Sequence, residues 1–191
     1  SGNLKRVSLE LGGKSPSIVF PDADLDMAAQ GVAGAIFFNH GQCCAAGSRL
    51  LVHENIYEEL IGRVSELAQN IKVGPGMCSD TDMGPLVSRE QQERVMNYIQ
   101  SGKQQGATTR AGRNLTGPEM ESGCYVAPTV FENVKPEMKI VAEEIFGPVV
   151  VAAPFEDLES VIARGNDTVF GLAASVWTKD INKAHKVAKG L

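Results

Sequence analysis

The chain has 191 residues, 43% of them hydrophobic, so it can bury a core without disulfides or metal ions. Its net charge of −5 comes from interspersed acidic and basic residues, which predicts binding neither to nucleic acid nor to a membrane surface. No apolar stretch approaches the roughly 20 residues that span a bilayer, and the N-terminus does not resemble a secretory signal. A cytoplasmic location is therefore expected, with an organelle matrix as the alternative.

The first half of the chain alternates short apolar runs with longer amphipathic segments. Three aspartates crowd the start of the first predicted helix, where carboxylates cap free amides, and Asn55 with Glu58 predicts a second capped start. In chain order, the predicted elements are a strand at 6–11, a strand at 17–20, a helix at 25–38, a strand at 49–53 and a helix at 55–70.

The second half opens with an irregular connection over 73–85, which is rich in Gly-Pro pairs. Ser88 and Gln91 then have capping-box spacing and predict a helix to about residue 105. The remaining predicted elements are strands at 125–131, 149–154 and 173–178 and helices at 158–166 and 181–189. This alternation predicts an α/β fold with three layers, in which helices flank a largely parallel sheet.

No complete nucleotide-phosphate motif is present. Gly13-Lys14-Ser15 resembles the end of a P-loop, but Ser8 occupies the position that requires the first glycine. The four cysteines are too irregularly spaced for a disulfide framework or a zinc site, so we expect reduced thiols and no metal.

Cys43 and Cys44 are candidates for a nucleophile, because they lie in a glycine-bounded turn of small residues that can present a thiol to a cleft. Cysteine is also among the most buried residue types, and Cys78 and Cys124 are interpreted as structural. His40 lies four positions before Cys44 and suggests a Cys–His dyad, with a solvated or capping histidine as the alternative.

Two further clusters contain carboxylates. Glu10 lies in an apolar run followed by Gly12-Gly13, which permits close approach of a ligand, so it is either a general base or a surface residue. Residues 143–148 (EEIFGP) combine two carboxylates, an aromatic ring and a turn, and alone would indicate a charged strand entry.

Together, residues 9–16 (LELGGKSP), 37–46 (FFNHGQCCAA) and 143–148 resemble the NAD(P)-dependent aldehyde dehydrogenase superfamily in order and in spacing. The likeness extends over essentially all 191 residues. It implies the catalytic-domain fold of that family, oxidation of a small aldehyde to a carboxylic acid, NAD or NADP as cofactor, and a homodimer or homotetramer.

The resemblance also assigns roles to individual residues. Cys44 would be the nucleophile that forms a thiohemiacetal and then a thioester, and Glu10 would activate the hydrolytic water. Glu144 would contact the nicotinamide ribose with Phe146 packed beside it. Leu11 and Gly12 would lie near the nicotinamide ring.

Relatives of this type imply a division of the chain. Residues 1–16 would end a coenzyme-domain segment, and residues 17–191 would form the catalytic domain. The upstream coenzyme domain and a C-terminal oligomerisation segment are expected to be absent, so the chain alone is expected to bind NAD(P) weakly and to be inactive. The alternatives are a cofactor-independent thiol hydrolase using Cys44 and His40, and a catalytically silent structural member.

Overall fold

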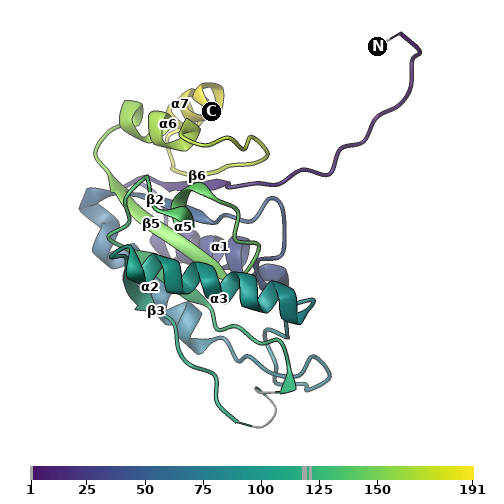
Figure 1. Cartoon of the computed structure of the whole chain (residues 1–191). Coiled ribbons are helices and arrows are strands. Elements are labelled where there is room, and N and C mark those ends of the chain that lie inside the picture. The colour runs from purple at the N-terminus through teal and green to yellow at the C-terminus, as the bar shows by residue number, and fades with distance from the viewer. Residues whose placement is uncertain (1, 118–119, 121) are drawn as a thin grey trace.

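The computed structural model describes residues 2–117, 120 and 122–191 (Figure 1). Within these residues, six strands form one sheet in the order β3-β4-β5-β2-β1-β6, and all neighbouring pairs are parallel except β3 and β4. The strands are β1 (Pro16–Val19), β2 (Arg49–His53), β3 (Thr108–Ala111), β4 (Thr129–Glu132), β5 (Val149–Phe155) and β6 (Ser175–Trp177).

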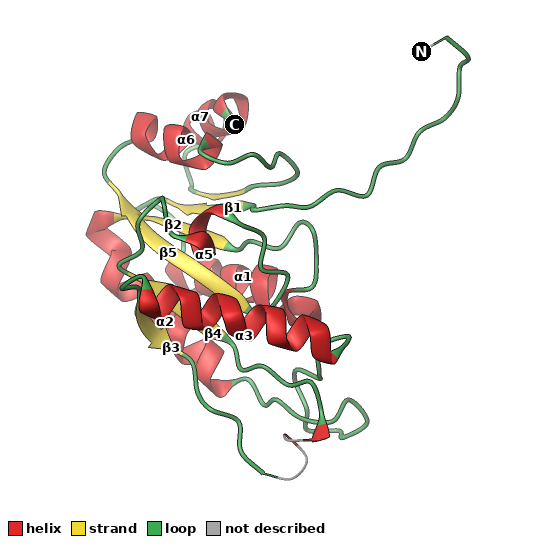
Figure 2. Cartoon of the chain, viewed as in Figure 1, coloured by secondary structure: helices red, strands yellow, loops and turns green. Residues whose placement is uncertain are grey.

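Helices cover both faces of this sheet (Figure 2). α3 lies in front of the sheet and α1 behind it in the view of Figure 1. The helices are α1 (Leu25–Phe37), α2 (Tyr57–Asn70), α3 (Arg89–Gln104), α5 (Lys139–Ala142), α6 (Leu158–Asn166) and α7 (Ile181–Gly190), with 3₁₀ turns η1 (Phe38–Gly41) and η2 (Glu54–Ile56). The predicted three-layer α/β fold is confirmed.

The central strands are apolar at almost every position because both faces of the sheet are buried. Leu50 and Val52 of β2 point into the core beneath α1 and α2. Leu51, between them, points to the opposite face and packs with Phe155 and with α6 and α7. The alternation of side chains along a strand therefore supplies two hydrophobic cores from one short sequence.

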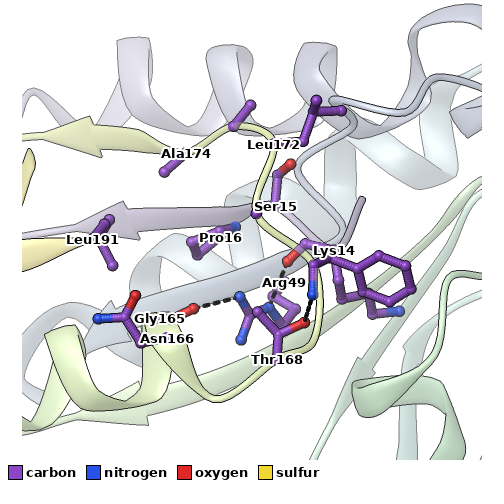
Figure 3. A pocket seen from close by; sticks show the side chains of 13 residues that line it. Lys14, Ser15, Pro16, Arg49, Gly165, Asn166, Thr168, Leu172, Ala174 and Leu191 are labelled. Atoms are coloured by element: carbon purple, nitrogen blue, oxygen red, sulfur yellow. Dashed lines mark hydrogen bonds between the residues drawn. The ribbon is translucent and has the colours of Figure 1, made fainter. Parts of the chain in front are cut away.

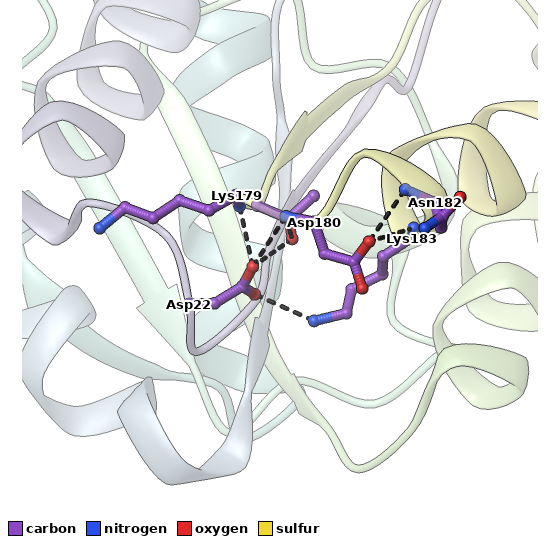
Figure 4. A network of polar contacts seen from close by, with 6 residues as sticks. Asp22, Lys179, Asp180, Asn182 and Lys183 are labelled. Carbon is purple, nitrogen blue, oxygen red and sulfur yellow. Dashed lines mark hydrogen bonds and ion pairs between the residues drawn. The ribbon is translucent and has the colours of Figure 1, made fainter.

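Asp22 connects the end of β1 to the start of α7 (Figure 4). Its carboxylate accepts hydrogen bonds from the Thr178 hydroxyl at 2.6 Å and from two backbone N–H groups, and it pairs with Lys183 Nζ at 3.0 Å. These bonds hold the pKa of the Asp22 carboxyl far below its usual range, against the opposing effect of desolvation. Asp22 thus fixes the edge strand β6 and its following helix against β1.

Several predicted boundaries were wrong. Residues 6–11 form no strand; they extend away from the sheet and are exposed, because no strand lies beside them within the described residues to complete their hydrogen bonds (Figure 1). α2 begins at Tyr57 because η2 precedes it, with the His53 side chain accepting from Asn55 N. The strand predicted at 125–131 is formed only from Thr129 to Glu132. β3 and α5 were not predicted.

None of the helices in the described parts of the chain is both long enough and apolar enough to cross a membrane.

Candidate active site

Cys43 and Cys44 lie in the turn that joins η1 to β2, which we call the cysteine turn (residues 41–47). Both thiols are free and partly exposed. The turn is fixed at its end by the hydrogen bond from Gly47 N to Ala35 O of α1, at 3.2 Å. The Cys44 N–H has no hydrogen-bond acceptor among the described residues, so this amide remains available to an oxyanion.

Gly13 brings the motif at 9–16 into contact with the cysteine turn. Burial changes sharply here, from exposed residues up to Leu11 to buried residues from Gly13 onward. The α-carbon of Gly13 lies directly against the backbone carbonyl oxygen of Cys44, in a space that no side chain could occupy. A glycine at this position therefore permits the close approach of the two segments.

Glu144 belongs to the same contact. Its Oε1 accepts a hydrogen bond from Gly13 N at 2.9 Å. Its Oε2 lies beside Gly12, at 2.7 Å from the position that a Cβ on Gly12 would take. The three sequence motifs, far apart in the chain, therefore meet around Gly12 and Gly13. A small crevice beside this contact is lined by residues of all three motifs, among them Gly13, Cys43, Ala46, Glu144 and Phe146.

Phe146 has an unusual backbone conformation. Its φ of 58° lies in the left-handed region, which costs a bulky residue roughly 1–3 kcal/mol. The residue remains 36% exposed. The surrounding structure therefore holds an aromatic side chain at the surface beside the Glu144 carboxylate, at a cost in backbone strain.

Lys14 is buried directly after the glycine pair (Figure 3). Its Nζ donates to Ile140 O at 2.8 Å, and its own carbonyl accepts from Arg49 Nε at 2.7 Å. Desolvation, followed by repulsion from Arg49, lowers the pKa of Lys14 to about 7, although Glu144 and Glu143 act in the opposite direction. The sequence motif contains Lys14, but its burial was not predicted.

Arg49 links the segment that contains Lys14 to the end of α6. Its guanidinium donates to Arg164 O at 2.9 Å and to Gly165 O at 2.7 Å. It thereby fixes the C-terminal end of α6 beside Lys14 (Figure 3). Two buried basic side chains, each hydrogen-bonded to backbone carbonyls, therefore hold the segment after Gly13 in place.

The structure does not bring every predicted site residue together. Gly12, Glu144 and the backbone of Cys44 are grouped by the contacts of the glycine pair, and Phe146 lines the same small crevice as Gly13 and Glu144. Glu10 and Leu11 are exposed in the extended N-terminal segment, and Glu10 has no hydrogen bond or ion pair with another described residue.

His40 does not form the dyad that was considered as an alternative. No hydrogen bond joins His40 to Cys44 among the described residues, and the His40 Nε2 faces Gly84 in the 73–85 connection. His40 also has a left-handed φ of 61° within η1. This geometry disfavours a Cys–His hydrolase.

At this contact, Glu144 and Phe146 are the side chains that could hold the ribose end of a nicotinamide cofactor. One carboxylate oxygen of Glu144 is held by Gly13, and the other is left to accept from a hydroxyl group. The lack of a side chain on Gly12 leaves space beside that oxygen, and the exposed Phe146 ring offers a flat apolar contact. By contrast, no group of His, Cys, Asp and Glu side chains in the described residues is arranged to hold a metal ion.

Comparison with known proteins gives one consistent result. The family profile described as "Aldehyde dehydrogenase family" matches residues 1–191. An aldehyde dehydrogenase of Aspergillus niger is 52% identical over 189 residues, which are 99% of this chain and 37% of that protein. An aldehyde dehydrogenase of Davidiella tassiana is 51% identical over 191 residues, 100% of this chain and 38% of that protein.

Solved structures agree. The NAD+ complex of aldehyde dehydrogenase from Bacillus cereus matches with a TM-score of 0.92 and 52% identity, covering 98% of this chain and 38% of that one. Betaine aldehyde dehydrogenase from Staphylococcus aureus in complex with NAD+ matches with a TM-score of 0.93 and 39% identity, covering 100% of this chain and 38% of that one. The chain therefore spans less than two-fifths of the length of these relatives.

Proposed function

The chain belongs to the aldehyde dehydrogenase family, and from this premise we propose that its residues carry out the oxidation of an aldehyde to a carboxylic acid with NAD(P)+. One observation carries the proposal. Gly13 packs against the Cys44 carbonyl and donates to Glu144, so a single residue joins the nucleophile turn to the carboxylate proposed for the cofactor.

Cys44 is the proposed nucleophile. Its thiolate forms a bond to the aldehyde carbon, and the carbonyl oxygen becomes an oxyanion that the free Cys44 N–H can stabilise. When the oxyanion reforms the C=O bond, hydride leaves the carbon and a thioester remains on Cys44. Cys44 is a partly exposed residue, which is consistent with access for a substrate.

Glu10 is the proposed general base for the second half of the reaction. It would take a proton from a water molecule that attacks the thioester carbon, after which the carbon–sulfur bond breaks and the Cys44 thiolate is restored. Glu10 lies three residues before the anchored Gly13, and its side chain is exposed.

The cofactor supplies the hydride acceptor when it is bound. Glu144 would accept from its ribose hydroxyls through the oxygen that Gly13 does not occupy, and Phe146 would pack beside the ribose. Leu11 and Gly12 would lie near the nicotinamide ring. Both solved structures described above are complexes with NAD+, which supports NAD(P) use without separating NAD from NADP.

The domain assignment is also a proposal. Residues 1–16 would end a coenzyme-domain segment, and residues 17–191 would form the catalytic domain of a dehydrogenase that assembles as a homodimer or homotetramer in the cytoplasm. The exposed path of residues before Gly13 supports this division. We expect the 191 residues alone to produce no NADH, so activity is to be measured on the complete protein.

The nucleophile is tested by a matched pair of variants in the complete protein. Cys44→Ser should abolish formation of NAD(P)H with a panel of aldehydes, because a serine hydroxyl is far less ionised than a thiol at neutral pH. Cys43→Ser, one position away and also partly exposed, should retain most of the activity. If Cys44→Ser oxidises aldehydes at the parent rate, or if only Cys43→Ser is inactive, the assignment is wrong.

Glu10 is tested by separating the two halves of the reaction. Glu10→Gln should still release about one equivalent of NAD(P)H per site in the first turnover, and the steady-state rate should then fall by about 10²–10⁴-fold. Mass spectrometry should detect the acyl group on Cys44 during this phase. A normal steady-state rate with no accumulated acyl-enzyme would remove Glu10 from the mechanism.

A further inference from the structure

Three side chains on one face of α3, those of Gln91, Arg94 and Tyr98, contact successive residues of the loop at 143–147. Gln91 Nε2 donates to Phe146 O at 2.8 Å and to Ile145 O at 3.2 Å. Arg94 Nη2 donates to Glu144 O at 3.1 Å, and the Tyr98 hydroxyl donates to the Glu143 carboxylate at 2.7 Å.

The spacing of these contacts follows from helix geometry. Positions 91, 94 and 98 are separated by three and four residues, so they lie on one face, and from the first to the last the helix rises roughly 10 Å. An extended run of three residues covers about the same distance. The loop therefore lies antiparallel to α3, with its residues 146, 144 and 143 opposite positions 91, 94 and 98.

Gln91 acts where the backbone is strained. The Ile145 carbonyl belongs to the peptide unit before Phe146, and the Phe146 carbonyl belongs to the unit after it. One amide nitrogen donates to both, so it fixes the two planes whose relative rotation defines the left-handed conformation of Phe146. Loss of this donor would therefore favour relaxation of Phe146 to a negative φ.

Two further contacts hold the same face of α3 against the 143–147 loop. The Arg94 guanidinium stacks over the Tyr98 ring at 5.8 Å, which orients both donors toward the loop. Val95, on the same helix, packs where a Cβ of Gly147 would lie. The helix thus supports the loop from Glu143 to Gly147 by three polar side chains and by Val95, which lies between Arg94 and Tyr98 in the helix.

We infer that Gln91, Arg94 and Tyr98 are positioning residues, and that this face of α3 is a template that holds Glu144 and Phe146 in the geometry required for the cofactor. The inference rests on the proposed function for its cofactor role, but its structural part does not. None of the three side chains is assigned to touch the substrate or the reacting atoms.

The chain offers a matched control in Gln92. Its Nε2 donates to Tyr125 O at 2.8 Å, so it is the same residue type on the same helix with a carbonyl acceptor outside the loop. Gln92 also accepts from Arg89 Nη1 at 2.6 Å. Gln91→Leu and Gln92→Leu therefore each remove two hydrogen bonds, at a similar cost to stability. Both variants are made in the complete protein and compared by melting temperature.

Two measurements then distinguish positioning from general stability. In the absence of cofactor, hydrogen–deuterium exchange of residues 143–149 should become at least fivefold faster in Gln91→Leu and should not change in Gln92→Leu. The Kd and KM for NAD+ should rise about tenfold in Gln91→Leu, with the KM for aldehyde within twofold of the parent value. Arg94→Met should give the same pattern with smaller changes.

The outcomes separate the two levels of the inference. Faster exchange with an unchanged Kd for NAD+ would support the α3 template and would overturn the cofactor role proposed for Glu144 and Phe146. Unchanged exchange in Gln91→Leu, or equal acceleration in both glutamine variants, would overturn the template itself. A fall in kcat with no change in the Kd for NAD+ or in exchange would also contradict it.

Discussion

Replacement of Gly13 by alanine tests the contact on which the proposed site depends. An ideal Cβ on Gly13 would overlap the backbone oxygen of Cys44, and the neighbour is main chain, so it cannot rotate away. Restoring an ordinary carbon–oxygen contact requires the two segments to separate by about 1 Å. The displacement acts directly on the peptide unit that follows Cys44 and on the hydrogen bond from Gly13 N to Glu144.

A misplacement of this size lowers the rate of an enzyme by about 10²-fold when it shifts a reacting group. We therefore expect Gly13→Ala to reduce kcat/KM by about 10²-fold in the complete protein, measured as NAD(P)H formation at saturating cofactor. Circular dichroism and the melting temperature establish whether the variant is folded. Its loss of activity should persist at temperatures well below the melting transition.

Two further alanine variants form a graded series with Gly13→Ala. Gly12→Ala meets only the end of the Glu144 side chain, at 2.7 Å, and the Phe170 ring, at 3.2 Å, so the neighbours can move and the loss should be under tenfold. Gly34→Ala meets nothing within 4 Å on the exposed side of α1, and it should stabilise the protein by about 0.5–1 kcal/mol without loss of activity. A folded Gly13→Ala protein with parental kcat/KM would refute the reasoning.

The remaining predictions concern two charged residues that hold the fold. Because the pKa of Lys14 is lowered from 10.5 to about 7, the folded state binds fewer protons than the unfolded state between these values, and the Lys14 contribution to stability rises with pH across that window. The free energy of unfolding, measured by urea denaturation, should rise less steeply with pH in Lys14→Met than in the parent protein. The same dependence on pH in both proteins would contradict the burial of an ionisable group. Asp22→Asn should lower the free energy of unfolding by about 1–2 kcal/mol at pH 7, because it removes a charged acceptor of four contacts from a partly exposed site. Since the pKa of Asp22 is depressed, its contribution should be full above the ordinary carboxyl pKa and should be lost as pH falls below it; a constant difference between the parent protein and the Asp22→Asn variant from neutral to strongly acidic pH would oppose this prediction.

Elements with a strong local pattern could be predicted from the sequence. β2 and α6 begin and end at the predicted residues. β2 is predicted by its apolar run with a β-branched residue, and the start of α6 is marked by the Asp157 capping box. β3 was missed because Thr108–Ala111 is short and mostly polar, as expected of an antiparallel strand at the edge of a sheet.

The strand predicted at 6–11 is the opposite error, because it was predicted but is not formed. Its alternating Val7, Leu9 and Leu11 satisfy the pattern of a strand, but a strand also needs a hydrogen-bonding neighbour, which the pattern does not specify. The apolar side chains at these positions remain exposed in the structure.

The candidate site was predicted as residue types but not as geometry. The motifs identified Cys44, Glu10 and Glu144, yet neither the left-handed φ of Phe146 nor the burial of Lys14 follows from local sequence, since both depend on contacts with distant segments. The positions of Gln91, Arg94 and Tyr98 on one helix face were a signal available beforehand. Their acceptors could not be known until the 143–147 loop was placed against α3.

The order of strands in the sheet has a consequence for synthesis on the ribosome. β1 pairs on one side with β2 and on the other with β6, where Ser17 lies opposite Ser175. At translation rates of about 5–20 residues per second, roughly 8–30 s pass between the emergence of these two partners. During that interval one edge of β1 is open to pairing with other chains, so co-translational protection by a chaperone would be most valuable before β6 has left the exit tunnel.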